Sequence, residues 1–297
     1  FSEDLIENFY CNSVSADITT TEYTGELMKC GDQITFFREP EVVVRRGTKD
    51  GTIKHDTIDT SPVTMTIDTE LEFSVKVAKA DVEMICNWSK WNDALLKRAT
   101  YRAGQLMDAD VLANMYLEAS PQNKGTGAGV QSGAYNLGVT GAPITLTNLN
   151  IWEYMVYMQG VLAEQCVPDS DAFFIVFPDV AKSFLLNSPN LRDNAGLAGA
   201  CCETPSNVVL NGRLPARIAG FDVYFSKNVN RVFDGGAGAF CYQIVAGWRG
   251  ATAFAVTVEE TRIMEDKDDW DLYIQGMSVY GRKVIQPEGL AGLYARF

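Results

Sequence analysis

The feature that most constrains this chain is a pair of extended segments within residues 31–77, joined by a long polar stretch. Residues 33–38 predict a first strand, and residues 47–61, with two glycines and charges of both signs, predict the connection. From Val63 to Val75 apolar and polar residues alternate, which predicts a second strand. An isolated two-stranded ribbon is only marginally stable in water. We therefore expect a long hairpin without a core of its own, held by a neighbouring subunit.

Two helices are predicted further along the chain. Residues 81–118 carry apolar side chains three or four positions apart, the spacing of one face of a long helix. A second helix begins after Asn150, whose distance from Glu153 matches a capping box, and runs to about Cys166. Between this helix and the last third of the chain, the all-apolar residues 172–177 predict a short strand buried on both faces.

Strand-like segments return in the last third of the chain, and Gly281 separates the final two. Together with the helices they predict an α+β fold, and no internal repeat is present. The predicted strands cover residues 218–225, 240–246, 251–258, 261–265, 271–277 and 282–285.

Residue types that support catalysis or metal binding are scarce. The single histidine, His55, lies in the polar connection of the hairpin, where no triad would hold it in a cleft. The seven cysteines are odd in number and widely spaced, which argues against a disulfide framework and a zinc site. We expect no catalytic residue, no cofactor and no metal, and no membrane contact, since no apolar run reaches roughly 18 residues. The formal net charge of −13 argues against a protein that reads nucleic acid, but not against one that encloses it.

A glycine-rich run lies between the two predicted helices and contains Gly125, Gly127 and Gly129. It lacks the Gly-Lys-Ser/Thr ending of a phosphate-binding P-loop. We interpret it as a flexible loop, and predict that its glycines and Gly281 act as hinges.

Charges of opposite sign gather in two separate segments. Residues 36–54 hold five basic and three acidic residues, a balance of +2, whereas residues 259–271 hold seven acidic and two basic residues, a balance of −5. Complementary charges of this kind set partner choice and register. We predict that these segments meet between subunits, through Arg38, Arg45, Arg46, Lys49 and Lys54 on one side and Glu259, Glu260, Glu265, Asp266, Asp268 and Asp269 on the other.

Three motifs, in this order, resemble a known family. The opening Gly31-Asp32-Gln33-Ile34 is similar to the start of that family's extended loop, and Gly220-Phe221-Asp222-Val223-Tyr224 to one of its strands. The closing stretch Tyr280-Gly281-Arg282-Lys283-Val284 continues to Pro287-Glu288-Gly289-Leu290, which matches the family's Tyr-Gly-x-x-Val-x-x-Pro-Glu-x-Leu. The chain thus resembles the major capsid proteins of tailed bacteriophages with the Hong Kong 97 fold, and is most similar to those of short-tailed phages.

The resemblance implies an organisation into four parts. It places an N-terminal arm at residues 1–30, an extended β-hairpin loop at 31–77, a peripheral domain with a long spine helix at 78–129 and 258–297, and an axial α/β domain at 130–257. Residues 188–216 are too few for the extra domain of some relatives, and no covalent cross-link can be mapped.

The implied function is a shell subunit of an icosahedral virion. The chain would form hexamers and pentamers of itself around double-stranded genomic DNA, and would be assembled in the cytoplasm of the bacterial host. A portal, a scaffolding protein and a decoration protein are the further candidate partners. Two alternatives stay open, an encapsulin-like nanocompartment shell and, from a different class, an acidic α/β hydrolase that would be a compact monomer.

Overall fold

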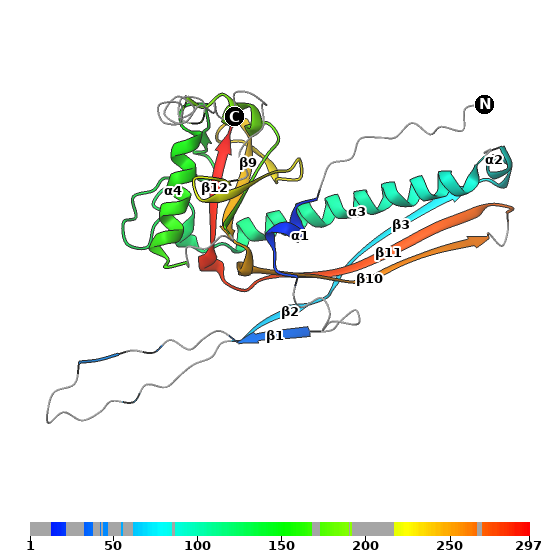
Figure 1. Ribbon diagram of the computed structural model, residues 1–297, viewed down its shortest axis with the longest axis horizontal. Helices are drawn as coiled ribbons and strands as arrows, with labels where there is room; N and C mark the ends of the chain where they lie inside the picture. The colour runs from blue at the N-terminus through cyan, green and yellow to red at the C-terminus, as the bar shows by residue number, and fades with distance from the viewer. Residues whose placement is uncertain are drawn as a thin grey trace, which may run out of the picture.

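The chain folds into a compact body, an elongated arm and a projecting ribbon (Figure 1). Helix α3 (Trp88–Glu118) runs the length of the arm, and two-stranded ribbon β1–β2 leaves its lower side. The computed structural model describes residues 13–21, 33–37, 42, 44–46, 55, 62–84, 87–167, 173–189, 191, 217–265 and 269–297.

The body is built on a seven-stranded sheet with helices on both faces. Helices α4 (Ile151–Glu164) and α5 (Ala181–Leu186) cover one face, while α1 (Ser15–Ile18) and the second half of α3 cover the other. The sheet order is β4 (Ile144–Thr145), β12 (Leu290–Arg296), β9 (Ala239–Trp248), β5 (Phe173–Phe177), β7 (Phe221–Phe225) and β6 (Arg217–Ile218), with β8 (Arg231–Asp234) beside β9.

Strand β5 confirms the buried strand predicted from its all-apolar sequence. Every residue of Phe173–Phe177 is buried, because neighbours flank the strand and helices cover both faces. Helix α4 is also confirmed, but its predicted capping box is wrong. The Asn150 side chain accepts from the Thr147 backbone N–H at 2.7 Å instead, and Glu153 accepts from the Tyr157 hydroxyl.

The arm consists of α3 and a three-stranded antiparallel sheet. The strand order is β10 (Thr252–Glu265), β11 (Leu272–Val284) and β3 (Thr69–Val77). A short helix, α2 (Lys79–Met84), lies between β3 and α3 in the chain. The sequence predicted four short strands where the structure has the two long strands β10 and β11. Gly281 does not end a strand; it pairs with Ala255 inside the ladder, and a bulge between Val256 and Val258 marks the one irregularity.

The predicted single strand 218–225 is also wrong. Ala219 and Gly220 both have positive φ angles, 50° and 82°, which turn the chain sharply and leave β6 and β7 as an antiparallel hairpin.

The ribbon consists of β1 (Gln33–Phe37) and β2 (Pro62–Thr66), paired from Gln33 opposite Thr66 to Phe37 opposite Pro62. The predicted second strand is therefore divided, because β3 pairs with β11 in a different sheet. The base of the ribbon also has a core within its own subunit. Met65 and Ile67 are fully buried against Ala253, Ala255 and Val279, so the expected absence of a core is wrong there.

The last strand lies in the body and not in the arm. Strand β12 pairs with β9 and β4, so assigning all of residues 258–297 to a peripheral unit is wrong for this strand. Six of its seven residues are buried, and only the sheet with helices on both faces can cover such a strand. The other domain boundaries stay predictions.

Candidate assembly surfaces

Asp108, in the middle of α3, joins three distant parts of the chain. One carboxylate oxygen, Oδ1, accepts from the backbone N–H groups of Val14 at 2.9 Å and Ser15 at 2.7 Å. The other, Oδ2, accepts from the Ser226 hydroxyl at 3.1 Å and the Asn228 side-chain amide at 3.0 Å. A buried carboxylate is tolerated when its oxygens are hydrogen-bonded in this way. Asp108 therefore fixes the N-terminal segment and the body to one point of α3.

Ion pairs further along α3 fix the helix to β11. The Arg282 guanidinium lies 2.7 Å from Asp110, and Lys283 lies 3.0 Å from Glu118. The Tyr280 hydroxyl also donates to Asp110 at 2.7 Å. Burial, together with this bond to a carboxylate, raises the pKa of Tyr280 above its usual range. The half of α3 nearest the body is thus rigidly attached to the arm sheet.

The far end of the ribbon, and the described residues 44–46 that follow β1 in the chain, present apolar and basic side chains to solvent. Phe37 is 74% exposed and Val44 is 91% exposed, and Arg45 and Arg46 are exposed beside it. Large apolar side chains on a projecting segment indicate a surface that another chain covers. Three further predicted contacts, Arg38, Lys49 and Lys54, lie outside the described residues.

The predicted acidic surface lies toward the outer end of β10 and β11. Glu260 and Glu265 are exposed there, and Asp269 is exposed but lies 3.4 Å from Lys76. Lys76 also pairs with Asp271 at 2.8 Å, and this pair raises the pKa of Lys76 above its usual range. The described structure does not include the side chain of Glu259 or the residues Asp266 and Asp268.

The structure does not bring the two charged surfaces to the same end of the subunit. Strand β1 runs away from the end of β10 that carries Glu265 (Figure 1). A contact between the two surfaces would therefore join different subunits. The predicted pairing is not tested by one subunit alone.

Three of the four glycines predicted as hinges, Gly125, Gly129 and Gly281, lie at positions that restrict a side chain. Gly125 and Gly129 have positive φ angles of 95° and 105°, and the Gly129 N–H donates to the Gln122 carbonyl at 2.8 Å. Gly281 lies so close to β2 that a Cβ atom would sit 2.7 Å from the Thr66 carbonyl oxygen. Their role as hinges stays a prediction.

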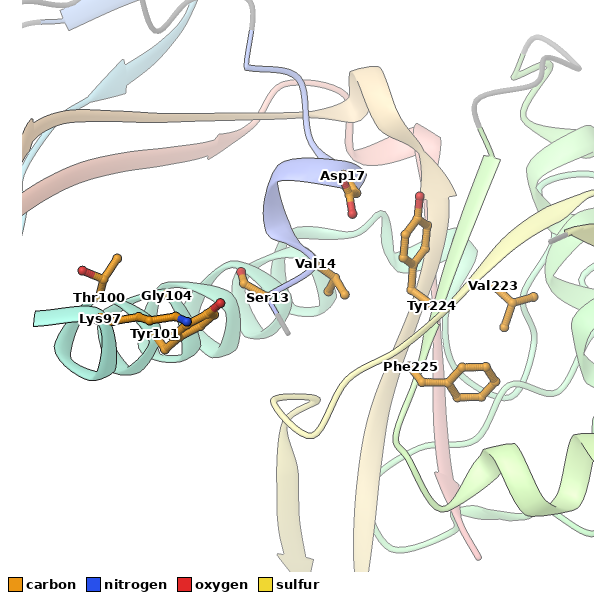
Figure 2. Close-up of a pocket in the computed structure, with 10 residues that line it drawn as sticks. All are labelled: Ser13, Val14, Asp17, Lys97, Thr100, Tyr101, Gly104, Val223, Tyr224 and Phe225. Carbon is orange, nitrogen blue, oxygen red and sulfur yellow. The ribbon is translucent and has the colours of Figure 1, made fainter. Parts of the chain in front are cut away.

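An open groove of about 880 Å³ lies where α1 crosses α3 beside β7 (Figure 2). Its lining includes Asp17 of α1, Lys97 and Tyr101 of α3, and Tyr224 of β7. The side chains of Val223 and Phe225 point away from the groove and pack on the α4 face of the sheet. Among the described residues no group of three or more histidine, cysteine or carboxylate side chains is placed to hold a metal ion. His55 is exposed, and none of the described helices is long and apolar enough to cross a membrane.

Comparison with known proteins gives matches in structure alone. No protein-family model matches the chain, and no curated protein sequence matches it. A solved chain from "Capsid structure of the Cyanophage P-SCSP1u" superposes with a TM-score of 0.71 at 12% identity, covering 100% of this chain and 92% of that one. A second chain, from "Asymmetric unit of bacteriophage PhiM1 mature capsid", superposes with a TM-score of 0.68 at 14% identity and covers 99% of this chain and 90% of that one.

A third chain, from "Capsid of Ralstonia phage GP4", gives a TM-score of 0.60 at 17% identity and covers 99% of this chain and 94% of that one. At such low identity these matches establish a shared fold. They confirm the predicted fold class, with its long helix, elongated sheet and compact body, over nearly the whole length of both chains. None of them supports the acidic hydrolase.

Proposed function

We propose that this chain is the major capsid protein of a tailed bacteriophage, with a structural and not a catalytic role. The observation that carries the proposal is the fold shared with phage capsid chains over at least 99% of this chain. An enzyme domain inserted into such a fold would leave part of the chain unmatched. The location of the protein would be the virion.

The finer assembly is also part of the proposal. The subunits form hexamers and pentamers of an icosahedral head of the Hong Kong 97 type, assembled in the host cytoplasm around double-stranded DNA. Closed shells require heterologous contacts that close by rotation. A projecting ribbon with exposed Phe37 and Val44 supports this, because it allows one subunit to reach a neighbour. Portal, scaffolding and decoration proteins are proposed as partners on the resemblance alone.

We place one of the contacts between the basic ribbon and the acidic outer end of β10 and β11. Exposed Arg45 and Arg46 would face Glu260, Glu265 or Asp269 of a neighbouring subunit. Each such pair is weak, but a closed shell repeats it in every subunit. Hexamers and pentamers also differ in curvature, and the glycines at 125, 127, 129 and 281 are proposed to accommodate that difference.

Electron microscopy of the expressed full-length chain tests the proposal. Closed particles are expected, while a compact monomer that does not assemble under any condition would overturn it. The double variant Arg45→Glu, Arg46→Glu tests the charged contact and should fold normally but assemble poorly. Its matched control is Lys182→Glu, Lys227→Glu, which reverses two exposed charges in the body and should leave assembly intact.

A further inference from the structure

The body and the arm have separate sheets that are joined by two short connections. Strand β9 of the body leads into β10 of the arm through residues 249–251, and β11 of the arm leads into β12 of the body through residues 285–289. The two connections touch, because the N–H groups of Ile285 and Gln286 donate to the Ala251 carbonyl at 2.8 and 3.1 Å. The angle between the arm and the body is therefore set at this joint, together with α3, which runs past it (Figure 1).

Residues 13–20, which include α1, lie across this joint (Figure 1). At one end of the segment, backbone N–H groups are held by Asp108 of α3. At the other end, the Thr20 N–H donates to the Thr252 carbonyl at 3.0 Å, and the Thr20 carbonyl accepts from the Phe254 N–H at 3.1 Å. The segment therefore connects α3 to the first residues of the arm strand β10.

The same segment supplies apolar side chains to a core that the body and the arm share. Val14 and Ile18 are four residues apart on one face of α1, and they are 5% and 0% exposed. The core to which they belong also contains Val245 of the body strand β9, Phe254 of the arm strand β10 and Leu112 of α3. The segment therefore completes the packing between the body, the arm and α3.

The attachment of the segment to α3 and to the body converges on the carboxylate of Asp108. This side chain is fully buried, and in the described structure it accepts hydrogen bonds from residues 13–15 on one side and from Ser226 and Asn228 of the body on the other. All of these donors are uncharged, and no ion pair between described residues includes Asp108. Burying a carboxylate is costly unless it is hydrogen-bonded. Loss of this one group would therefore free the segment from α3 and from the body together.

The other face of the body sheet does not depend on the segment. Among the described residues, the core between the sheet and helices α4 and α5 contains none from residues 13–20. Strand β5 and its neighbours are thus held by contacts that remain when the segment leaves. The segment can be released while the body stays folded.

We propose that residues 13–20 are a strap that holds the arm at one angle to the body, and that the strap is fastened at Asp108 and at Thr20. When the strap is released, the joint keeps only the two short connections and the direct contacts of α3. The arm then takes a range of angles relative to the body. The strap is a property of the free subunit, so it goes beyond the proposed shell function and does not depend on it.

Pulsed electron paramagnetic resonance on dissociated subunits of the full chain tests the strap. Spin labels are attached to non-canonical residues that replace Ser89, at the start of α3, and Lys182, in α5 of the body, both of which are exposed. The wild-type strap should give one narrow distribution of label distances. Asp108→Ala removes the acceptor at one end of the strap and should broaden the distribution. Thr20→Pro removes the N–H that bonds to β10, leaves Asp108 intact and should broaden it as well.

Hydrogen exchange of the same samples reports whether the strap is released. Exchange of residues 13–20 should accelerate about tenfold or more in Asp108→Ala, the change expected when hydrogen bonds to a charged acceptor are lost. Exchange in β5 should change less and shows that the body is folded. The matched control is Asp17→Asn, which removes an exposed carboxylate from the same segment and should leave the distances and the exchange unchanged.

Three results would overturn the proposal. The first is the same distance distribution in the wild type and in variants whose residues 13–20 exchange faster. The second is unchanged exchange of residues 13–20 in both variants, since the strap would then not be fastened at Asp108 or Thr20. The third is exchange in β5 that accelerates as much as exchange in the segment in both variants, which would make the segment an inseparable part of the body. Particle formation is recorded separately by electron microscopy, so this test can fail while the proposed capsid function stands.

Discussion

The body and the ribbon of this subunit bury their apolar side chains in opposite ways. In the body, Phe174 of β5 is fully buried between helices and neighbouring strands of its own chain. In the ribbon strands β1 and β2, Met65 is fully buried, Ile34 and Phe36 are partly buried, and Phe37 at the far end of β1 is exposed. The body therefore has the means to be stable alone, whereas the ribbon is proposed to be covered by another subunit.

The largest expected difference in stability is between two phenylalanine-to-alanine substitutions, one in the body and one in the ribbon. Phe174→Ala should lower the free energy of unfolding by about 3–5 kcal/mol, because it leaves a cavity in a packed core. Phe37→Ala should change it by less than about 0.5 kcal/mol, as exposed positions do, yet should reduce particle yield. Urea unfolding of dissociated subunits and electron microscopy measure the two effects. A large loss of subunit stability in Phe37→Ala would contradict the comparison.

Asp108 connects the body to α3 and to the N-terminal segment, and its loss should have the next largest effect. Asp108→Ala leaves the N–H groups of Val14 and Ser15 without their acceptor and should cost about 3 kcal/mol. Hydrogen exchange of residues 13–20 should accelerate more than exchange in β5. The matched control is Asp110→Asn on the same helix. Because its ion pair is partly exposed, this variant should lower the free energy of unfolding by about 1 kcal/mol or less. Equal effects of the two variants would show that Asp108 has no special connecting role.

Gly281 tests how the ribbon is attached to the arm. Gly281→Ala would place a Cβ atom 2.7 Å from the Thr66 carbonyl oxygen and 3.1 Å from the Ile67 Cα, and should cost about 1–3 kcal/mol. Exchange in β1 and β2 should accelerate while β5 is unchanged. Gly235→Ala is the control, because a Cβ atom there meets nothing within 4 Å. Unchanged exchange in the ribbon would mean that its base does not depend on this close approach.

Lowering the pH should have the smallest effect on stability, and this effect should arise in the body. Asp234 accepts from the Gly141 N–H at 2.6 Å and the Tyr294 hydroxyl at 3.2 Å, and the Gly141 bond holds the pKa of Asp234 below its usual range. Its stabilising contribution is therefore present above the pKa of the unfolded chain, about 4, and is lost as the pH falls through the lower folded value. The melting temperatures of wild type and Asp234→Asn should differ at pH 6 and converge near pH 3. A constant difference would contradict this role.

Local signals in the sequence predicted part of this structure. The all-apolar β5 and the periodic α3 follow from their own residues. The division between β2 and β3 does not, because Met65 and Ile67 continue in the same alternation as Leu71 and later residues, so no break in the pattern marks the change of sheet.

Long-range contacts account for the other differences. Asp108 is a charged residue inside a helix, and its partners lie 93–95 and 118–120 positions away, so nothing near it in the sequence reveals its role. Gly281 reads as a strand break until the neighbouring β2 explains why no side chain fits there. The predicted contacts between subunits depend on chains that a single subunit does not contain.

The central claim is that neighbouring subunits shelter the ribbon while the body shelters itself. Hydrogen exchange of residues 33–37 and 62–66, compared between dissociated subunits and assembled particles, tests it most directly. Assembly should slow exchange in these two strands strongly and leave Phe173–Phe177 unchanged. Equal exchange of the ribbon in free and assembled subunits would contradict the account.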